Sequence, residues 1–224
     1  MTQDLRRWLA QASEAGELVT CRGVDWRIEI GALTDLAGRQ PDGPALLFDE
    51  IPGYSRGWRV LTNTLGTARR VARAANLAGG NSTLDLVAAW KRRYSEVKLV
   101  PPVRVQTGPV FEHTMNDGEV DLLRFPAPQW RSGDGGRYIG TAPLLVTRDP
   151  DSGSVNVAVA RVMVHDSRHV FYRVSSGKDS RRHFAAAERA GTPMPIAISN
   201  FCAVFCGRSA NFRNSTSFCP HVSP

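Results

Sequence analysis

Two apolar runs in the second half of the chain constrain its fold most. The first run leads up to Arg148, and the second extends from Val155 to Val164. The turn between them combines Asp, Pro and Gly, residues that suit the backbone angles of tight turns. β-Branched runs joined by such a turn predict a hairpin, and a third β-rich run at 170–172 extends it to a three-stranded meander.

Two polar side chains, Asn156 and Arg161, interrupt the second apolar run. A buried amide or guanidinium is costly unless it is paired, so a core strand that keeps both is expected to face something polar. Because strand side chains alternate, their odd spacing puts them on opposite faces, and a shared site requires a bulge or a ligand that wraps around the strand. They lie roughly 16 Å apart on a regular strand, about the length of a flavin nucleotide. Alternatively, Asn156 ends the ladder and Arg161 extends into solvent.

The chain divides into two unlike parts, and the predicted class is α+β. Helix and strand patterns alternate up to about residue 105, which predicts an amino-terminal α/β domain at 1–105. Pro101 and Pro102 end the helical pattern, and residues 106–198 favour strands and turns. Residues 199–224 have no clear period and are expected to form an aberrant, poorly packed tail. Expected helices begin near residues 5, 28, 67, 82 and 180, and expected early strands lie at 17–22, 45–48 and 59–63.

The charge balance narrows the classes of function. The net charge is +7, from 28 basic and 21 acidic residues, and nearly all the basic ones are arginine. A guanidinium suits phosphate and carboxylate, so the excess fits a phosphate-bearing cofactor, an anionic substrate or simply a solvated basic surface. The basic residues are scattered and show no zinc-finger or RNA-binding spacing, which argues against nucleic acid as a partner.

Apolar runs and cysteines add two further expectations. No apolar run approaches the ~20 residues needed to span a bilayer, so we expect a cytoplasmic protein with no membrane partner. Cys202, Cys206 and Cys219 crowd the last segment, with His221 nearby. Their spacing lacks the paired knuckle of a zinc site, so unpaired thiols are expected.

Several longer motifs follow one another in a fixed order. They are the runs at 134–141, 148–153 and 161–166 in the second half, and those at 4–9, 16–19, 25–31, 43–48, 51–54 and 59–63 in the first. Together with Asn156, they resemble the UbiD family, whose members are decarboxylases dependent on prenylated FMN. The resemblance extends from about Asp4 to Ile198.

This resemblance implies roles for the polar residues of the second run. In the family, the Asn matching Asn156 gives its carbonyl oxygen to a divalent metal, usually manganese, that bridges to the cofactor phosphate. Potassium is a further expected ion. The Arg matching Arg161 lies beside the flavin ring and orients the substrate carboxylate, which makes Arg161 the expected catalytic residue. Backbone around Val159 and Ala160 is expected to line the flavin. A phosphate end and a ring end agree with the roughly 16 Å separation.

A second metal ligand is implied at Asp179, where the family has His. A carboxylate can replace imidazole on manganese, but its charge beside a phosphate weakens cofactor binding unless a metal holds both. Lys178 is the expected cofactor contact beside it. Alternatively, Lys178 and Asp179 form an exposed loop pair. His183 is either a substitute ligand or the start of a helix.

The implied reaction removes carbon dioxide from an aromatic or α,β-unsaturated acid, with the prenylated flavin as electron sink. A flavin prenyltransferase is the implied supplier of the cofactor, and full-length members are homo-oligomers. The resemblance places the family's proton-donating Glu, a third metal ligand and a cofactor-contacting Lys after residue 198. Residues 106–198 are therefore expected to form part of a split β-barrel, and the short chain is expected to be inactive. The alternatives are a non-catalytic flavin- or phosphate-binding module and a basic nucleic-acid-binding barrel.

Overall fold

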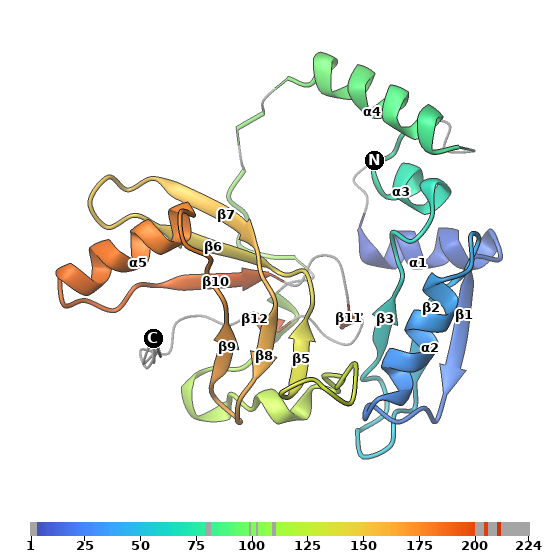
Figure 1. Cartoon of the computed structure of the whole chain (residues 1–224), viewed down its shortest axis with the longest axis horizontal. Coiled ribbons are helices and arrows are strands. Elements are labelled where there is room, and N and C mark those ends of the chain that lie inside the picture. The colour runs from blue at the N-terminus through green and yellow to red at the C-terminus, as the bar shows by residue number, and fades with distance from the viewer. Residues whose placement is uncertain are drawn as a thin grey trace.

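The computed structural model combines helices and strands, as the α+β prediction requires (Figure 1). It describes residues 4–78, 82–98, 100–101, 103–108 and 111–199, together with the backbone of two short strands at 204–205 and 210–211. The tail cysteines and His221 lie outside the described residues, as does most of the predicted tail. None of the helices in the described part is long and apolar enough to cross a membrane.

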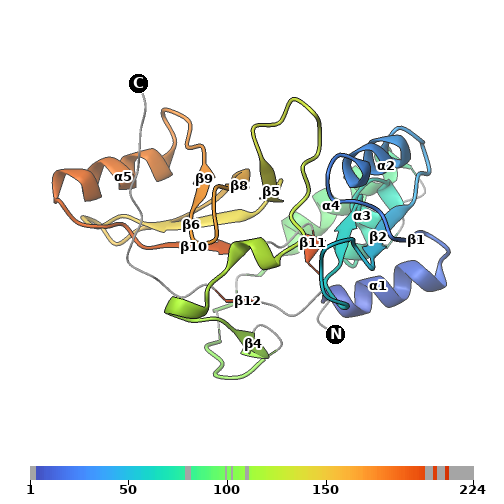
Figure 2. The ribbon, with the colours of Figure 1, turned by 90° about the horizontal axis from the view of Figure 1, so that it is seen from below.

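The first half is a small sheet with helices on both sides. Strands β1 and β2 are parallel, β3 is antiparallel to β2, and β11 is antiparallel to β3. Seen from below, α2 lies on one side of these strands and α1 on the other (Figure 2). The elements are α1 (Leu5–Glu14), β1 (Leu18–Arg22), α2 (Glu29–Gly38), β2 (Ala45–Asp49), β3 (Val60–Thr62), α3 (Ala68–Ala74), α4 (Thr83–Glu96) and β11 (Val204–Phe205).

Alternation along β2 explains this layering. Leu46 and Phe48 pack on one face with Ile30 of α2, whereas Leu47 packs on the other face with Trp8 of α1. A strand covered on both faces has no polar side, and four of the five β2 residues are buried. The sequence of β2 is accordingly a continuous apolar run up to Asp49.

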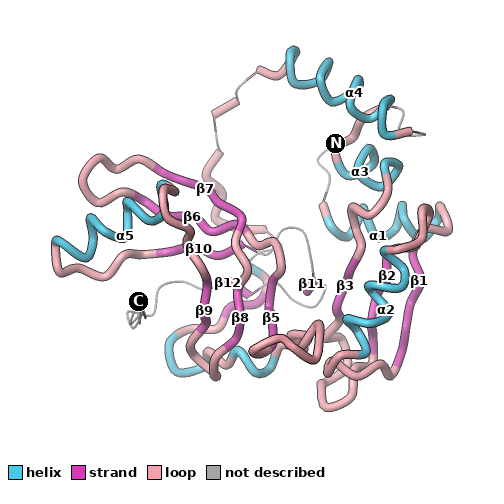
Figure 3. Tube along the Cα trace, viewed as in Figure 1, coloured by secondary structure: helices cyan, strands magenta, loops and turns pink. Residues whose placement is uncertain are grey.

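The second half consists mostly of antiparallel strands and loops, with α5 beside them (Figure 3). One sheet has the order β10-β6-β7, a second has the order β5-β8-β9, and β12 pairs with β4. The described strands do not close into a barrel, so a split barrel stays a prediction. The elements are β4 (His113–Thr114), η2 (Asp117–Glu119), η3 (Leu122–Arg124), β5 (Arg137–Gly140), β6 (Leu144–Arg148), β7 (Val155–Val159), β8 (Val162–Val164), β9 (Val170–Tyr172), α5 (Asp179–Arg189), β10 (Ile196–Ser199) and β12 (Ala210–Asn211).

The predicted hairpin is confirmed, but the prediction of one long second strand is wrong. β6 and β7 pair as expected, with Val146 opposite Val157. The run then leaves that sheet at Ala160, whose N–H donates to the Pro143 carbonyl at 3.0 Å, and continues as β8 in the other sheet. Asn156 and Arg161 therefore do not lie on one strand. The third strand pairs with β8, so the predicted meander is divided between two sheets.

The two halves meet along a short segment before β5. The Gln129 N–H donates to the Trp26 carbonyl at 3.1 Å, and the Ile28 N–H donates to the Gln129 carbonyl at 2.9 Å. Trp130 packs against the core between α2 and the first sheet. A Cβ on Gly31 would lie 2.0 Å from the Trp130 carbonyl oxygen, so glycine is required at this close approach. The proposed division near residue 105 stays a prediction.

Candidate functional site

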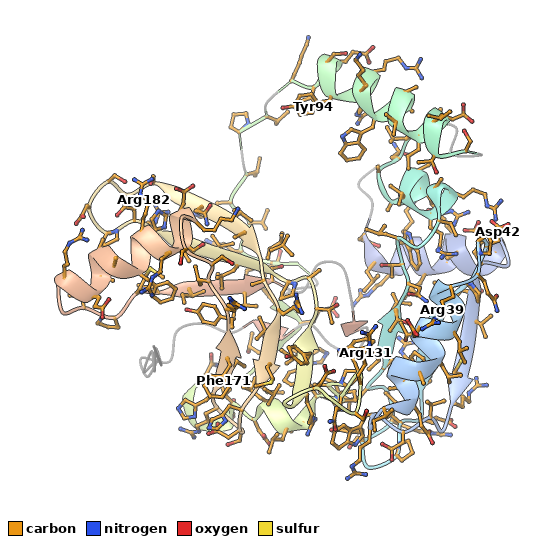
Figure 4. The ribbon with its side chains drawn as sticks, viewed as in Figure 1. Arg39, Asp42, Tyr94, Arg131, Phe171 and Arg182 are labelled. Atoms are coloured by element: carbon orange, nitrogen blue, oxygen red, sulfur yellow. The ribbon has the colours of Figure 1, made fainter. Side chains whose placement is uncertain are left out.

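A cleft of about 500 Å³ lies where the two halves of the chain meet. Figure 4 labels Arg39, just after the end of α2, and Arg131, in the loop before β5, which both line it. Two crossover links between the sheets of the second half also reach it, with Thr141 from the β5–β6 link and Arg161 from the β7–β8 link. The remaining lining residues are Gly31, Thr34, Asp35, Gly38, Asn63, Trp130, Asp134 and Tyr138.

Arg161 is the cation of this cleft that is free to bind a ligand. Its side chain is exposed, and in the described part of the chain it makes no hydrogen bond or ion pair. The other two guanidiniums share the carboxylate of Asp35, at 2.6 Å from Arg39 and 3.9 Å from Arg131. Because these two are partly neutralised, an incoming anion meets its strongest unpaired positive charge at Arg161.

The rest of the lining is mixed in character. Asp134 accepts a hydrogen bond from the Arg131 N–H at 3.0 Å, which shapes the loop that forms one wall. Trp130 and Tyr138 add aromatic surface. The Trp130 indole N–H is buried without a hydrogen-bond partner among the described residues. Mixed aromatic and charged walls of this volume suit a small aromatic anion.

Asn156 lies in a second polar cluster, beneath α5. Its side-chain N–H donates to the Ser180 hydroxyl at 2.8 Å, which leaves its carbonyl oxygen available to another group. Thr147 lies opposite Asn156 in the pairing of β6 with β7, and its hydroxyl is hydrogen-bonded to His183 Nδ1 at 3.0 Å. Thr147, Ser180 and His183 are all buried. These bonds fix the first turns of α5 on the sheet formed by β6 and β7.

The remaining predicted residues surround the start of α5. Lys178 occupies the position just before the helix, and Asp179 is its first residue. The Asp179 carboxylate accepts from Arg182 at 3.1 Å, and its side chain is 59% exposed. His183 is the fifth helical residue rather than the first, and its Nδ1 is occupied by Thr147. No group of three His, Cys, Asp or Glu residues able to hold a metal occurs in the described part of the chain.

In the structure, the residues that the sequence analysis assigned to one site lie in two places. Arg161 lines the cleft, whereas Asn156, Lys178 and Asp179 are absent from its lining in the described chain. Val159 is exposed, and Ala160 is buried at the crossover. Sequence reasoning missed the wall formed by α2. The spacing of Asp35 and Arg39 signals only a helical ion pair, and nothing local indicates that this pair faces Arg131.

Comparison with known proteins identifies the class of this fold. Residues 9–90 match the family model of the 3-octaprenyl-4-hydroxybenzoate carboxy-lyase N-terminal domain, and residues 102–204 match that of the Rift-related domain of the same enzyme. A phenolic acid decarboxylase of Escherichia coli O157:H7 is 29% identical over 204 residues, which are 88% of this chain and 42% of the relative.

Solved structures agree with this assignment. The closed form of the vanillic acid decarboxylase of Sedimentibacter hydroxybenzoicus superposes with a TM-score of 0.80 at 28% identity, covering 89% of this chain and 43% of the other. An evolved dimeric form of the UbiD-class enzyme HmfF from Pelotomaculum thermopropionicum, in complex with prFMN, superposes with a TM-score of 0.72 at 29% identity, covering 89% of this chain and 45% of the other.

The fold is therefore that of a decarboxylase family. The chain belongs to the UbiD family and corresponds to the amino-terminal part of the enzyme. It spans less than half the length of the curated relative named above.

Proposed function

We propose that this chain provides the part of a UbiD-type decarboxylase that binds prenylated FMN and the substrate carboxylate. The substrate class is an aromatic or α,β-unsaturated acid, and the reaction is its non-oxidative, reversible decarboxylation. The observation that carries the proposal is the unpaired guanidinium of Arg161 in a cleft of about 500 Å³. A small-molecule site typically has a volume of about 300–1,000 Å³.

The residues of the cleft fit a planar anionic ligand. Prenylated FMN, when bound, supplies the electron sink into which the carbon–carbon bond electrons flow. Arg161 holds and orients the carboxylate through charge-assisted hydrogen bonds. The aromatic surfaces of Trp130 and Tyr138 exclude water from one side of the cleft and favour a flat substrate over a flexible aliphatic acid.

The described residues do not by themselves fit a metal. Asn156 and Asp179 are the proposed oxygen ligands for manganese, and Lys178 is a proposed phosphate contact. A third ligand is lacking in the described part of the chain, and Asp179 is already paired with Arg182. We therefore assign no step to manganese or potassium, and Val159 and Ala160 are proposed only as backbone contacts to the flavin.

In our proposal, turnover also requires a proton donor that is not assigned among the described residues. Proton delivery by a positioned acid contributes roughly 100-fold to 10,000-fold, and the expected acid is not among the residues identified here. The chain is therefore expected to bind flavin weakly and to release no carbon dioxide. A flavin prenyltransferase would supply the cofactor in the cell, and full-length members would associate as homo-oligomers. A non-catalytic flavin-binding module is the alternative for this same cleft.

The test is a flavin titration followed by quenching of flavin fluorescence. Arg161→Ala should weaken binding of prenylated FMN in the presence of a phenolic acid on the order of tenfold, since a lost charge-assisted bond is worth about 1.5–3 kcal/mol. Arg56→Ala, which removes an exposed guanidinium paired with Glu50, is the matched control and should have no effect. Equal affinity of the Arg161→Ala variant and the wild type would contradict the assignment of the cleft.

Carbon dioxide release distinguishes the two alternatives. A panel of aromatic and α,β-unsaturated acids should give no turnover with the short chain. Robust turnover that disappears in Arg161→Ala would show that the site is complete here and that our account of the missing acid is wrong.

A further inference from the structure

One buried guanidinium, that of Arg70 on α3, is bonded to the backbone of a residue that lines the cleft. Arg70 is 2% exposed. Its Nη2 donates to the Gly43 carbonyl at 2.8 Å, and its Nε donates to the Asn63 carbonyl at 3.2 Å. Among the described residues, its side chain is bonded to no carboxylate. A buried cation bonded to neutral groups keeps much of its desolvation cost, so a stabilising role alone does not explain it.

The cleft residue that Arg70 holds, Asn63, has an unusual backbone. Asn63 follows β3 directly and lines the cleft. Its φ of 55° lies in the left-handed region, which a residue other than glycine occupies at a cost. Its carbonyl also accepts from the Gly66 N–H at 3.1 Å, so two donors fix the same peptide. Backbone strain that surrounding bonds maintain is common where a side chain must be presented to a ligand.

The side chain of Asn63 is fixed as well. Its Nδ2 donates to the Thr34 carbonyl at 2.9 Å, and because a carbonyl oxygen can only accept, this bond decides which way the amide is turned. The Thr34 hydroxyl is in turn hydrogen-bonded at 3.0 Å to the hydroxyl of Thr62, which is buried. The Asn63 Oδ1 receives no hydrogen bond from the described residues, so it can accept one from a group in the cleft.

We propose that Asn63 binds a hydroxyl group of the ligand through its side-chain carbonyl oxygen, and that Arg70 is the positioning residue that holds Asn63 for this contact. The inference rests on the proposed function of the cleft and deepens it. Asn63 comes from the first half of the chain and Arg161 from the second, so both halves contact the ligand. An amide oxygen needs a donor, which an ionised carboxylate lacks and a hydroxyl supplies. The ribityl chain of the flavin and a phenolic substrate both carry such hydroxyls.

Asn63→Gly tests the contact without straining the fold. Because glycine adopts a φ of 55° freely, this gain offsets the lost bond to Thr34, and the thermal midpoint should stay within about 3 °C of the wild type. The flavin affinity measured by fluorescence quenching should fall roughly threefold to tenfold, the effect of one neutral hydrogen bond. An asparagine with only a structural role would leave the affinity unchanged.

Arg70→Lys tests the positioning. An ammonium keeps the charge but lacks the planar fork that bonds the Gly43 and Asn63 carbonyls together, so the midpoint should fall by roughly 5–10 °C and the affinity about as much as in Asn63→Gly. In a chain that already carries Asn63→Gly, Arg70→Lys should still lower the midpoint but should not weaken flavin binding further. Arg69→Lys, at a neighbouring arginine that is 48% exposed, is the control and should leave the affinity unchanged.

Two titrations of the whole chain distinguish the sources of the hydroxyl. The first uses FMN alone, and weaker binding to Asn63→Gly there assigns the contact to the flavin. The second adds either 4-hydroxybenzoate or benzoate to the chain with FMN bound. Because these two acids differ by one hydroxyl, a loss confined to 4-hydroxybenzoate assigns the contact to the substrate. Either result supports the proposal.

The same titrations separate this inference from the proposed function. Affinity that falls in Arg161→Ala but not in Asn63→Gly would overturn the inference alone. Unchanged affinity in both variants, or no saturable flavin binding by the wild type, would overturn both. Additive losses in the chain with Asn63→Gly and Arg70→Lys would show that Arg70 does not act through Asn63. Asn63→Gly decides the hydroxyl contact even if Arg70→Lys fails to fold.

Discussion

Glu17, a partly buried glutamate just before β1, links that strand to α3. It accepts hydrogen bonds from Arg73 and from Arg69, both on α3, and its side chain is 13% exposed. Burial raises the pKa of Glu17, but the hydrogen bonds and charges of the two arginines outweigh it, so the pKa lies below the usual 4.5. Glu17→Gln should lower the free energy of unfolding at neutral pH by about 1–2 kcal/mol.

This loss should depend on pH in one direction. Because the folded pKa of Glu17 is lowered, its contribution is complete above 4.5 and disappears as the pH falls through the folded value. Urea unfolding of wild type and variant at several pH values measures the difference. Glu14→Gln, at an exposed glutamate of α1, is the control. A difference that stays constant down to the acid transition would rule out the ionised pair as its source.

At the scale of elements, the approach of α2 to the Trp130 backbone sets one wall of the cleft. Gly31→Ala would force a Cβ to within 2.0 Å of the Trp130 carbonyl oxygen, so the helix or the loop must move. We expect a loss of roughly 1–3 kcal/mol in stability and weaker flavin binding. Gly38→Ala is a strict control, because it lies on the same helix and cleft wall and its Cβ would meet Asn63 at an ordinary 3.7 Å. Thermal unfolding and the flavin titration measure both effects; equal behaviour of the two variants would contradict the close approach.

Elements whose signals are local were predictable. Ser82 caps α4 through the Asp85 N–H, and Gly191, with a φ of 63°, follows α5, as the residue types indicated. The division of the second run was not, because nothing local in the run marks the point after Ala160 at which the chain stops pairing with β6 and begins to pair with β5. The same is true of the cleft. Arg161 was identified by its polarity within an apolar run, whereas its neighbours from α2 are brought there only by packing between the halves.

At the scale of the whole molecule, Arg137 connects the two halves. Its guanidinium donates to the Tyr54 hydroxyl at 2.5 Å and to the Phe125 carbonyl at 2.8 Å, and it lies 4.4 Å from the centre of the Trp26 ring. Arg137→Gln removes these contacts, which should cost about 2–4 kcal/mol. We expect calorimetry to resolve two unfolding transitions in place of one.

Arg27→Gln is the control for this prediction. Arg27 also lies over the Trp26 ring, at 4.6 Å, but its side chain is 65% exposed and its ion pair with Asp25 spans 3.5 Å. Its loss should cost less than ~1 kcal/mol and leave a single transition. If both variants unfold alike, the ring contact and not the hydrogen-bonded network holds the halves together.

The crossover at Ala160 has a mechanical consequence. Arg161 follows β7 and precedes β8, so its peptide belongs to neither sheet. A small rotation of one sheet against the other would be taken up by this link and would displace the guanidinium, while side chains within each sheet would keep their spacing. If Arg161 binds a carboxylate as we propose, any contact that sets the angle between the two sheets, however remote, should therefore change the affinity for an acid.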